Sequence, residues 1–261
     1  MQTHPEAAQF EISLVDARLG RAGLRPLAVG GAALVLASLG PASAGEGWDT
    51  LLFGSLDAGA STFLTVGAKV ALDRLDGDGF VLLGSLGAGR RPERASCNCV
   101  PAFTLAQTRY TLLGSALVGY QWFHDWGVVA AFAGPETTAE MLADGLGARM
   151  AMAPRYGLRL HGEIWARPSA DTLVHGVAIL GTAREDGWAR LAWGYRLWGA
   201  YLGPEASLYA DRLGYRKWSF GVHATDFALG RYSLRVSAGL QRETGTARPA
   251  PYLSIATLAP F

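Results

Sequence analysis

Residues Trp198 to Arg231 read WGAYLGPEASLYADRLGYRKWSFGVHATDFALGR, and apolar and polar side chains alternate along two successive segments of this stretch. The second segment places apolar side chains on one face and mostly polar ones on the other: Trp218, Phe220, Val222 and Ala224 against Lys217, Ser219, Gly221, His223 and Thr225. A period of two indicates β-strands, because successive side chains of a strand point to opposite faces. Between the segments lies a turn signal, residues 211–214. The stretch therefore predicts two antiparallel strands with one apolar and one polar face.

The same alternation continues along the chain from residue 49 onward. It predicts about twelve strands, at roughly 49–59, 61–74, 80–90, 104–121, 126–141, 154–166, 171–184, 188–197, 199–210, 214–228, 231–242 and 250–261. Spans of this length, separated by turns, are typical of an outer-membrane β-barrel. A soluble β-sandwich or soluble barrel is the competing fold, but it would usually turn more often and carry more charge on its wet face. We predict an all-β chain that forms a single antiparallel outer-membrane β-barrel.

Connection lengths and aromatic residues agree with this fold. When both termini of a barrel face the periplasm, the even-numbered connections are short and the odd-numbered ones can be long. The predicted even connections, 75–79, 123–125, 167–171, 197–199 and 229–231, are all tight, whereas 91–103, 142–153 and 242–249 are the longest odd ones. Aromatic side chains near the predicted strand ends match the girdles of such barrels: Tyr110, Tyr120, Trp193, Trp198 and Tyr232.

The N-terminal 44 residues resemble a secretory signal peptide. Arg18, Arg21 and Arg25 precede a short apolar run that ends near Leu39, and residues 42–44 read Ala-Ser-Ala. A positive region, a short apolar region and a small-residue site predict cleavage after Ala44. Removal of residues 1–44 would leave 261 − 44 = 217 residues, 45–261, as one transmembrane barrel domain.

Composition and cysteine content exclude several classes of function. The chain is 50% hydrophobic and 17% charged, with a formal net charge of +1, so no basic excess favours nucleic acid as a partner. Its two cysteines, Cys97 and Cys99, are separated by one residue. A disulfide between them is open in an oxidising compartment but geometrically strained, and idle thiols are the alternative. No ligand set for a metal lies nearby, and we predict neither a metal nor a cofactor.

Two segments echo each other. Each places Gly-Pro-Glu within a predicted strand, at 134–136 and 203–205, with Glu136 and Glu205 on the polar face. Proline cannot donate to a strand ladder and is normally confined to edges or bulges. We therefore expect a local bulge at both sites that directs the carboxylate into the lumen.

These residues resemble the family of the cellulose biosynthesis protein BcsS. The resemblance is carried by Tyr201-Leu-Gly-Pro-Glu205-Ala, by Tyr215-Arg-Lys-Trp218, by Gly221-Val-His223-Ala-Thr225, and by the closing Pro251-Tyr252-Leu-Ser-Ile. It covers most of the mature chain, although Cys97-Asn-Cys99 is not a feature of the family. The resemblance implies an exported envelope protein tied to bacterial cellulose production, without a known catalytic activity.

The polar faces of the predicted strands gather charges of both signs in the lumen: Arg109, Glu136, Glu140, Arg159, His161, Glu163, Arg190, Arg196, Glu205, Lys217, His223 and Arg235. The simpler interpretation is that these groups pair with one another and with water, because charges removed from bulk water need partners. The functional interpretation is a pore, or a surface on which Arg, Glu and Tyr201 or Tyr209 contact sugar hydroxyls. Glu136, Glu163, Arg190, Arg196, Glu205, Lys217, His223 and Arg235 are our candidate cluster.

An enzyme is the third alternative. A hydrolytic site of the serine type would need a serine and a histidine within hydrogen-bond reach of each other. Ser219 and His223 share a face, but four residues along a strand separate them by about 13 Å. His161 and Glu163 are closer, at about 7 Å along their strand, with no serine evidently beside them. We therefore expect no catalytic residues. The expected function is a non-enzymatic accessory of cellulose biosynthesis, export or assembly in the outer membrane, with lipid and cellulose or its secretion machinery as partners, and a general small porin is the alternative.

Overall fold

The computed structural model describes residues 49–96, 104–146, 148–246 and 248–260. The expected signal peptide and both cysteines lie outside these ranges. The strands are β1 (Thr50–Ala58), β2 (Thr62–Ala71), β3 (Gly79–Ser96), β4 (Thr104–His124), β5 (Gly127–Asp144), β6 (Arg149–Ala151), β7 (Arg155–Ser169), β8 (Thr172–Gly181), β9 (Asp186–Leu197), β10 (Ala200–Ala210), β11 (Arg216–Leu229), β12 (Tyr232–Glu243) and β13 (Ala250–Pro260). Within the described ranges no helix is long and apolar enough to cross a membrane.

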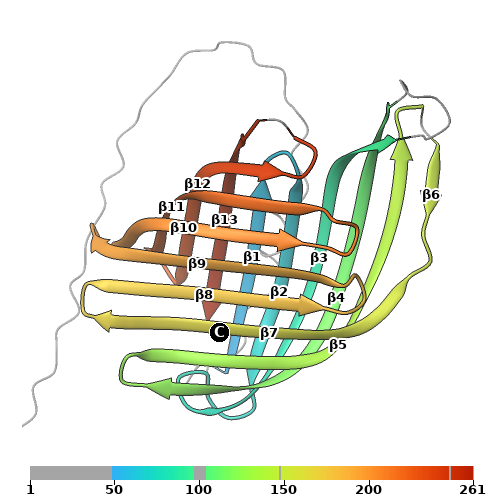
Figure 1. The fold of residues 1–261 in the computed structure, drawn as a ribbon. Helices are drawn as coiled ribbons and strands as arrows, with labels where there is room; N and C mark the ends of the chain where they lie inside the picture. Colours follow the sequence, from blue (N-terminus) through green and yellow to red (C-terminus); the bar gives the residue numbers. More distant parts are fainter. Residues whose placement is uncertain (1–48, 97–103, 147, 247, 261) are drawn as a thin grey trace, which may run out of the picture. The chain divides into compact units, whose positions relative to one another are not determined.

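The strands close into a ring in which each neighbour is antiparallel (Figure 1). β1 pairs with β13, and β4 pairs with β5, so neither side of the sheet remains open. The short strand β6 pairs with residues 141–143 near the C-terminal end of β5, whereas β7 pairs with residues 127–138 of β5. The barrel therefore has twelve long strands, as predicted, with β6 as an addition. β3 extends to Ser96, beyond the predicted end at residue 90.

Successive connections alternate between the two ends of the barrel, and four of the five at one end have only two residues. At the tight-turn end lie the connections 72–78, 125–126, 170–171, 198–199 and 230–231, all of which were predicted to be short. The opposite, loop end carries residues 59–61, 145–146, 148, 152–154, 182–185, 211–215, 244–246 and 248–249 among the described ranges. Trp198 and Gly199 have φ of 50° and 80°, the left-handed pair of values that a two-residue hairpin turn needs.

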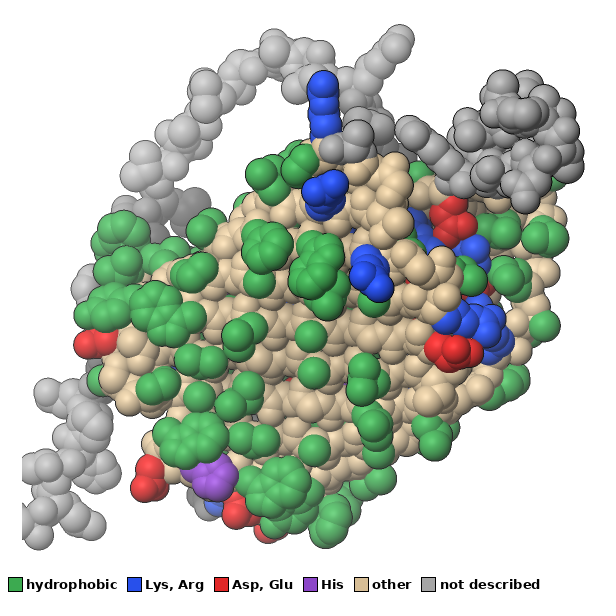
Figure 2. Space-filling model, in the orientation of Figure 1, with side chains coloured by type: hydrophobic (Ala, Val, Ile, Leu, Met, Phe, Trp, Pro, Cys, Tyr) green, Lys and Arg blue, Asp and Glu red, His purple; other side chains and the backbone are tan. Residues whose placement is uncertain are grey.

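The outer face of the barrel is apolar and its inner face is mostly polar, as the alternation predicts. Large apolar side chains on the strands are more than half exposed, among them Leu86, Leu112, Leu158, Leu191, Phe220, Val222 and Leu240. Figure 2 shows hydrophobic side chains spread across the visible face, with charged groups gathered toward its margins. The alternate residues of the same strands are buried polar groups, such as Thr111, Ser219, Thr225, Ser237 and Gln241. This distribution suits an outer surface in lipid.

Aromatic side chains collect near the tight-turn end, as a girdle requires. Phe80 packs edge-on against Tyr120 with ring centroids 5.1 Å apart, and Tyr120 lies 5.0 Å from Trp122. Trp193 and Trp198 are exposed on β9, in another part of the barrel wall, and on the turn that follows it.

The expected bulges at the two prolines are wrong. The register of β5 against β7 runs without a shift through Pro135, and that of β10 against β11 runs without one through Pro204. On the other side of each strand, pairing is interrupted for two residues and then resumes in the same register. Proline removes one donor, and the glycine before it lets the neighbouring backbone approach closely, so the ladder opens locally without an inserted residue. An ideal Cβ on Gly203 would lie 2.0 Å from the carbonyl oxygen of Trp193.

Candidate functional site in the barrel lumen

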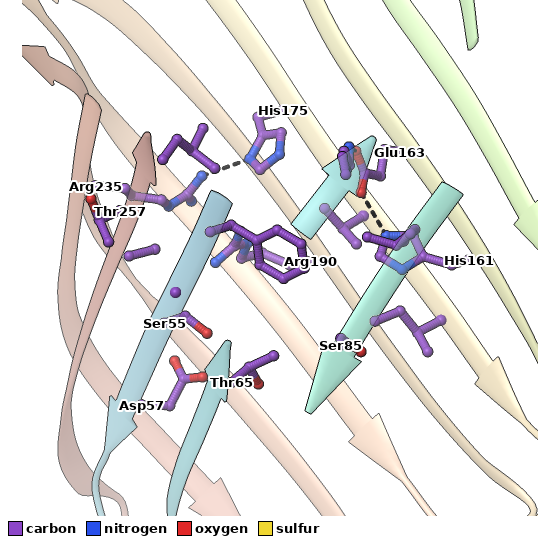
Figure 3. Close-up of a pocket in the computed structure, with 18 of the residues that line it drawn as sticks. Ser55, Asp57, Thr65, Ser85, His161, Glu163, His175, Arg190, Arg235 and Thr257 are labelled. Carbon is purple, nitrogen blue, oxygen red and sulfur yellow. Dashed lines mark hydrogen bonds and ion pairs between the residues drawn. The ribbon is translucent and has the colours of Figure 1, made fainter. Parts of the chain in front are cut away.

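The lumen contains an elongated cavity of about 940 Å³. Its wall includes Leu51 and Leu258 near the tight-turn end and Arg91 and Tyr215 near the loop end, so the cavity follows most of the barrel axis. Figure 3 shows polar side chains of its middle part, which come from several strands of the barrel. Side chains that cross the lumen divide this space into layers.

At the loop end, six charged side chains form a closed chain of ion pairs, which we call the mouth ring. Its members are Arg91, Glu93, Arg109, Glu140, Arg184 and Asp211, joined in that order by contacts of 2.5, 2.7, 3.2, 3.3 and 3.8 Å and closed by a 3.3 Å contact between Asp211 and Arg91. Arg91 belongs to β3, and Asp211 follows β10 on the opposite side of the barrel, with five strands between them in either direction. The mouth ring therefore spans the lumen.

The connection between β8 and β9, residues 182–185, folds into the lumen; we call it the inward turn. Ala183 and Arg184 are only 6% and 9% exposed, which is unusual for the middle of a hairpin turn. The backbone N–H of Ala183 donates to the Glu136 carboxylate at 2.9 Å. Gly157 on β7 permits this approach, because a Cβ there would lie 2.4 Å from the Ala183 nitrogen. Glu136 thus holds the inward turn, and Arg184 contributes its charge to the mouth ring.

A middle layer of polar contacts crosses the lumen nearer its centre. Lys69 on β2 forms an ion pair with Glu163 on β7, although β3, β4 and β5 lie between these strands. Arg235 on β12 donates to Nδ1 of His175 on β8 at 2.8 Å, across three intervening strands. Figure 3 shows Arg235 with His175, and His161 beside Glu163.

Arg235 is also bound to Glu205 on β10, with 2.5 Å between Nη2 and Oε2. Ser237 donates to the same carboxylate at 3.0 Å, and Tyr252 donates to its other oxygen at 2.8 Å. Three donors therefore satisfy the buried Glu205 carboxylate.

Apolar side chains line the lumen toward the tight-turn end. Val81, Leu83, Leu117, Ala130 and Phe132 form a buried inner cluster with Ala71. Phe53 and Leu75 pack against it, and Leu75 reaches it from the 72–78 turn. The Gln121 amide donates to the carbonyl oxygens of Leu75 and Gly77 at 3.0 and 2.8 Å, which fixes that turn beneath the barrel.

Outside the strands, two pKa shifts follow from local contacts. On the exposed 72–78 turn, hydrogen bonds from Arg74 lower the pKa of the Asp76 carboxyl below its ordinary value. In the loop after β10, burial raises the pKa of the Tyr215 phenol, and the Glu243 carboxylate acts in the same direction. The Arg91 guanidinium lies 3.9 Å from the centre of the Tyr215 ring, so the ring supports the mouth ring through a cation–π contact.

The eight candidate residues are distributed over several levels of the lumen. Glu136 lies at the inward turn, while Glu163, Glu205 and Arg235 belong to the middle layer. His223 has a structural role, because its ring nitrogens contact the Thr225 hydroxyl on the same strand at 2.7 Å and the Trp193 carbonyl on β9 at 3.0 Å.

Three candidates lie apart from these networks. Arg196 is exposed at the tight-turn end, near the Tyr201 ring. Arg190 and Lys217 line the lumen without a carboxylate at ion-pair distance among the described residues.

Several lumen residues were missed by the sequence reasoning. Arg184 was placed at the end of the predicted strand 171–184 and Asp211 in the turn 211–214, and Lys69, Asp57 and His175 were not singled out. Alternation alone would have placed Asp57, Lys69 and His175 on inner faces. Nothing in a four-residue turn signals that it folds inward. Within the described ranges no group of His, Cys, Asp and Glu side chains is arranged to hold a metal ion.

A closed ring of twelve antiparallel strands with an apolar outer face and a polar lumen is a β-barrel of the outer-membrane type. The family model for the cellulose biosynthesis protein BcsS matches residues 51–261. The chain therefore belongs to the BcsS family, as the motifs of its strands predict.

Solved structures with a similar fold are distant in sequence. The KdgM porin is 8% identical, with a TM-score of 0.42 over 81% of this chain and 99% of its own. The translocator domain of the autotransporter NalP from Neisseria meningitidis is 13% identical, with a TM-score of 0.49 over 84% of this chain and 90% of its own. No curated protein matches the chain. These likenesses concern the fold alone.

Proposed function

We propose that this chain is an outer-membrane barrel, mature from residue 45, that serves cellulose export or assembly as a non-enzymatic accessory. The observation that carries the proposal is the family match, which extends from β1 to the end of β13. The apolar outer face and the aromatic residues near the tight-turn end support a position in the outer membrane.

The architecture of the lumen supports an accessory rather than an open channel for a polymer. The mouth ring and the middle layer both cross the lumen, and the inward turn is held by two buried groups, the Glu136 carboxylate and Arg184. A glucan chain could pass only after these contacts had separated. Residues of the lumen are therefore proposed to contact a glycan or a partner of the secretion machinery, rather than to form a permanent pore.

A general uptake channel is the second candidate, and the cavity of about 940 Å³ favours it. Deletion of the gene in a cellulose-producing strain separates the two functions. The accessory role predicts loss of extracellular cellulose with unchanged permeability to small solutes, restored by the full-length gene. Normal cellulose output together with reduced solute uptake would contradict it and support the channel.

The enzyme alternative receives a separate test. Purified barrel in detergent would be incubated with cello-oligosaccharides and with lipid A, and the products analysed by mass spectrometry. We expect no conversion by the wild-type protein. Turnover that is lost in Glu205→Ala or His223→Ala would overturn the non-enzymatic proposal.

A further inference from the structure

A small hollow of about 40 Å³ opens beside the lumen cavity, at the wall formed by β9 to β13 and β1. Asp57, Trp188, Arg190 and Lys217 line both spaces, so the hollow is a side pocket of the lumen. Three serine hydroxyls complete much of its wall: Ser207, Ser219 and Ser254.

Charges of both signs face this hollow without being paired. Among the described residues, Arg190 and Asp57 form no hydrogen bond and no ion pair, and the Arg190 Nε atom is buried without a partner. The ammonium group of Lys217 has only a 3.5 Å contact with the Ser61 hydroxyl. Buried ionised groups elsewhere in this lumen are paired, as the cost of desolvation requires. The exception indicates that a ligand or ordered water completes these three groups.

The balance of charge selects the class of ligand. An anion attracted by Arg190 and Lys217 would also meet the carboxylates of Asp57 and Glu205, both on the same hollow. A cation attracted by the carboxylates would be repelled by Arg190 and Lys217. A neutral molecule rich in hydroxyl groups avoids both, because each hydroxyl can donate to a carboxylate and accept from a guanidinium or ammonium group. The serine hydroxyls and the Gln241 amide offer further donors and acceptors of the same kind.

We propose that the lumen cavity binds one neutral glycosyl unit of a glucan against Asp57, Arg190 and Lys217, which line both spaces, and that the hydroxyls of this unit reach into the small hollow. The proposal rests on the proposed role in cellulose production for the identity of the sugar. Arg190 and Asp57 bind adjacent hydroxyls from opposite sides, and the serine side chains complete the contacts. Trp188, which lies 5.4 Å from the Arg190 guanidinium, reports occupancy through its fluorescence.

Titration of the full-length protein in detergent with cellotetraose tests this site, read by calorimetry and tryptophan fluorescence. We expect saturable binding to the wild type and at least about a tenfold loss of affinity in Arg190→Met, since a polar partner of the ligand is removed. Arg196→Met is the matched control, because it removes an exposed arginine from the same strand. Lys217→Met provides a second variant of the hollow. Heat-modifiable migration of each variant shows that the barrel has folded.

No saturable binding of cellotetraose to the folded wild type would overturn the site. Stronger binding of tetragalacturonate or inorganic phosphate would overturn the choice of a neutral ligand. Equal affinity in Arg190→Met and the wild type would show that the sugar binds elsewhere. These failures are distinct from failure of the proposed function, because the cellulose phenotype of the deletion strain does not depend on this hollow.

Discussion

At the scale of single residues, the lumen is organised by carboxylates that each hold several partners. Glu205 accepts from Arg235, Ser237 and Tyr252, and its partner Arg235 extends on to His175. Glu136 plays the corresponding role at the loop end, where it receives the N–H of Ala183 and an Arg159 guanidinium at 3.3 Å. The two Gly-Pro-Glu segments therefore each supply one carboxylate that binds several donors: Glu136 at the inward turn and Glu205 in the middle layer.

The Glu205–Arg235 pair gives a test at this scale. The side chains are 6% and 7% exposed, so Glu205→Gln leaves a buried guanidinium without its countercharge. We expect the free energy of unfolding to fall by about 3–5 kcal/mol, measured by urea unfolding in lipid vesicles. The double variant Glu205→Gln/Arg235→Met should recover much of this loss. Simple addition of the two single effects would contradict direct coupling.

Inner and outer residues were predictable one by one, but their partners were not. Period-two alternation correctly assigned Phe220 and Val222 to the outer face, where both are exposed. The crossing contacts join strands far apart in sequence, such as Lys69 on β2 and Glu163 on β7. Such a pairing depends on the closed ring and its register, which alternation within one strand does not encode.

At the scale of elements, the pairing of β9 with β10 depends on a close approach at Gly203. The backbone carbonyl of Trp193 occupies the place that a Cβ would take, at 2.0 Å. Gly203→Ala should lower the free energy of unfolding by about 1–3 kcal/mol, because the strands must move apart. Gly162→Ala is the matched control, since no atom lies within 4 Å of its ideal Cβ. Equal stabilities for the two variants would contradict this account of the Gly-Pro-Glu segment.

The inward turn gives the second test at this scale. Arg184 contacts Glu140, Asp186 and Asp211, so Arg184→Ala leaves these carboxylates without a shared cation and breaks the mouth ring. We expect a several-fold faster swelling of proteoliposomes in a small sugar. Arg212→Ala removes only the exposed pair with Glu185 and should leave swelling unchanged. Unchanged swelling in Arg184→Ala would show that the Arg184 side chain and the closed mouth ring do not limit passage.

Strands were predicted well because an amphipathic period persists over many residues, whereas short connections contain too little information. The prediction failed at the prolines, where the structure interrupts pairing without inserting a residue. It also failed to find β6 and the inward fold of residues 182–185. Both depend on packing against other strands rather than on local propensity.

At the scale of the whole molecule, an apolar outer wall surrounds a lumen with a charged loop end, a polar middle and an apolar region toward the tight-turn end. The mouth ring and the middle layer make the cavity a chamber crossed by side chains. A barrel of this kind suits a protein that binds or guides a glycan, and a partner could open it by separating the ion pairs.

The conductance of the purified wild-type barrel in a planar bilayer tests this central claim most directly. We predict low conductance at neutral pH, because the ion pairs of the mouth ring and the middle layer are intact, and we predict that Arg184→Ala increases it. A large, stable conductance of the wild-type protein, unchanged in Arg184→Ala, would contradict a closed chamber and identify the barrel as a general channel.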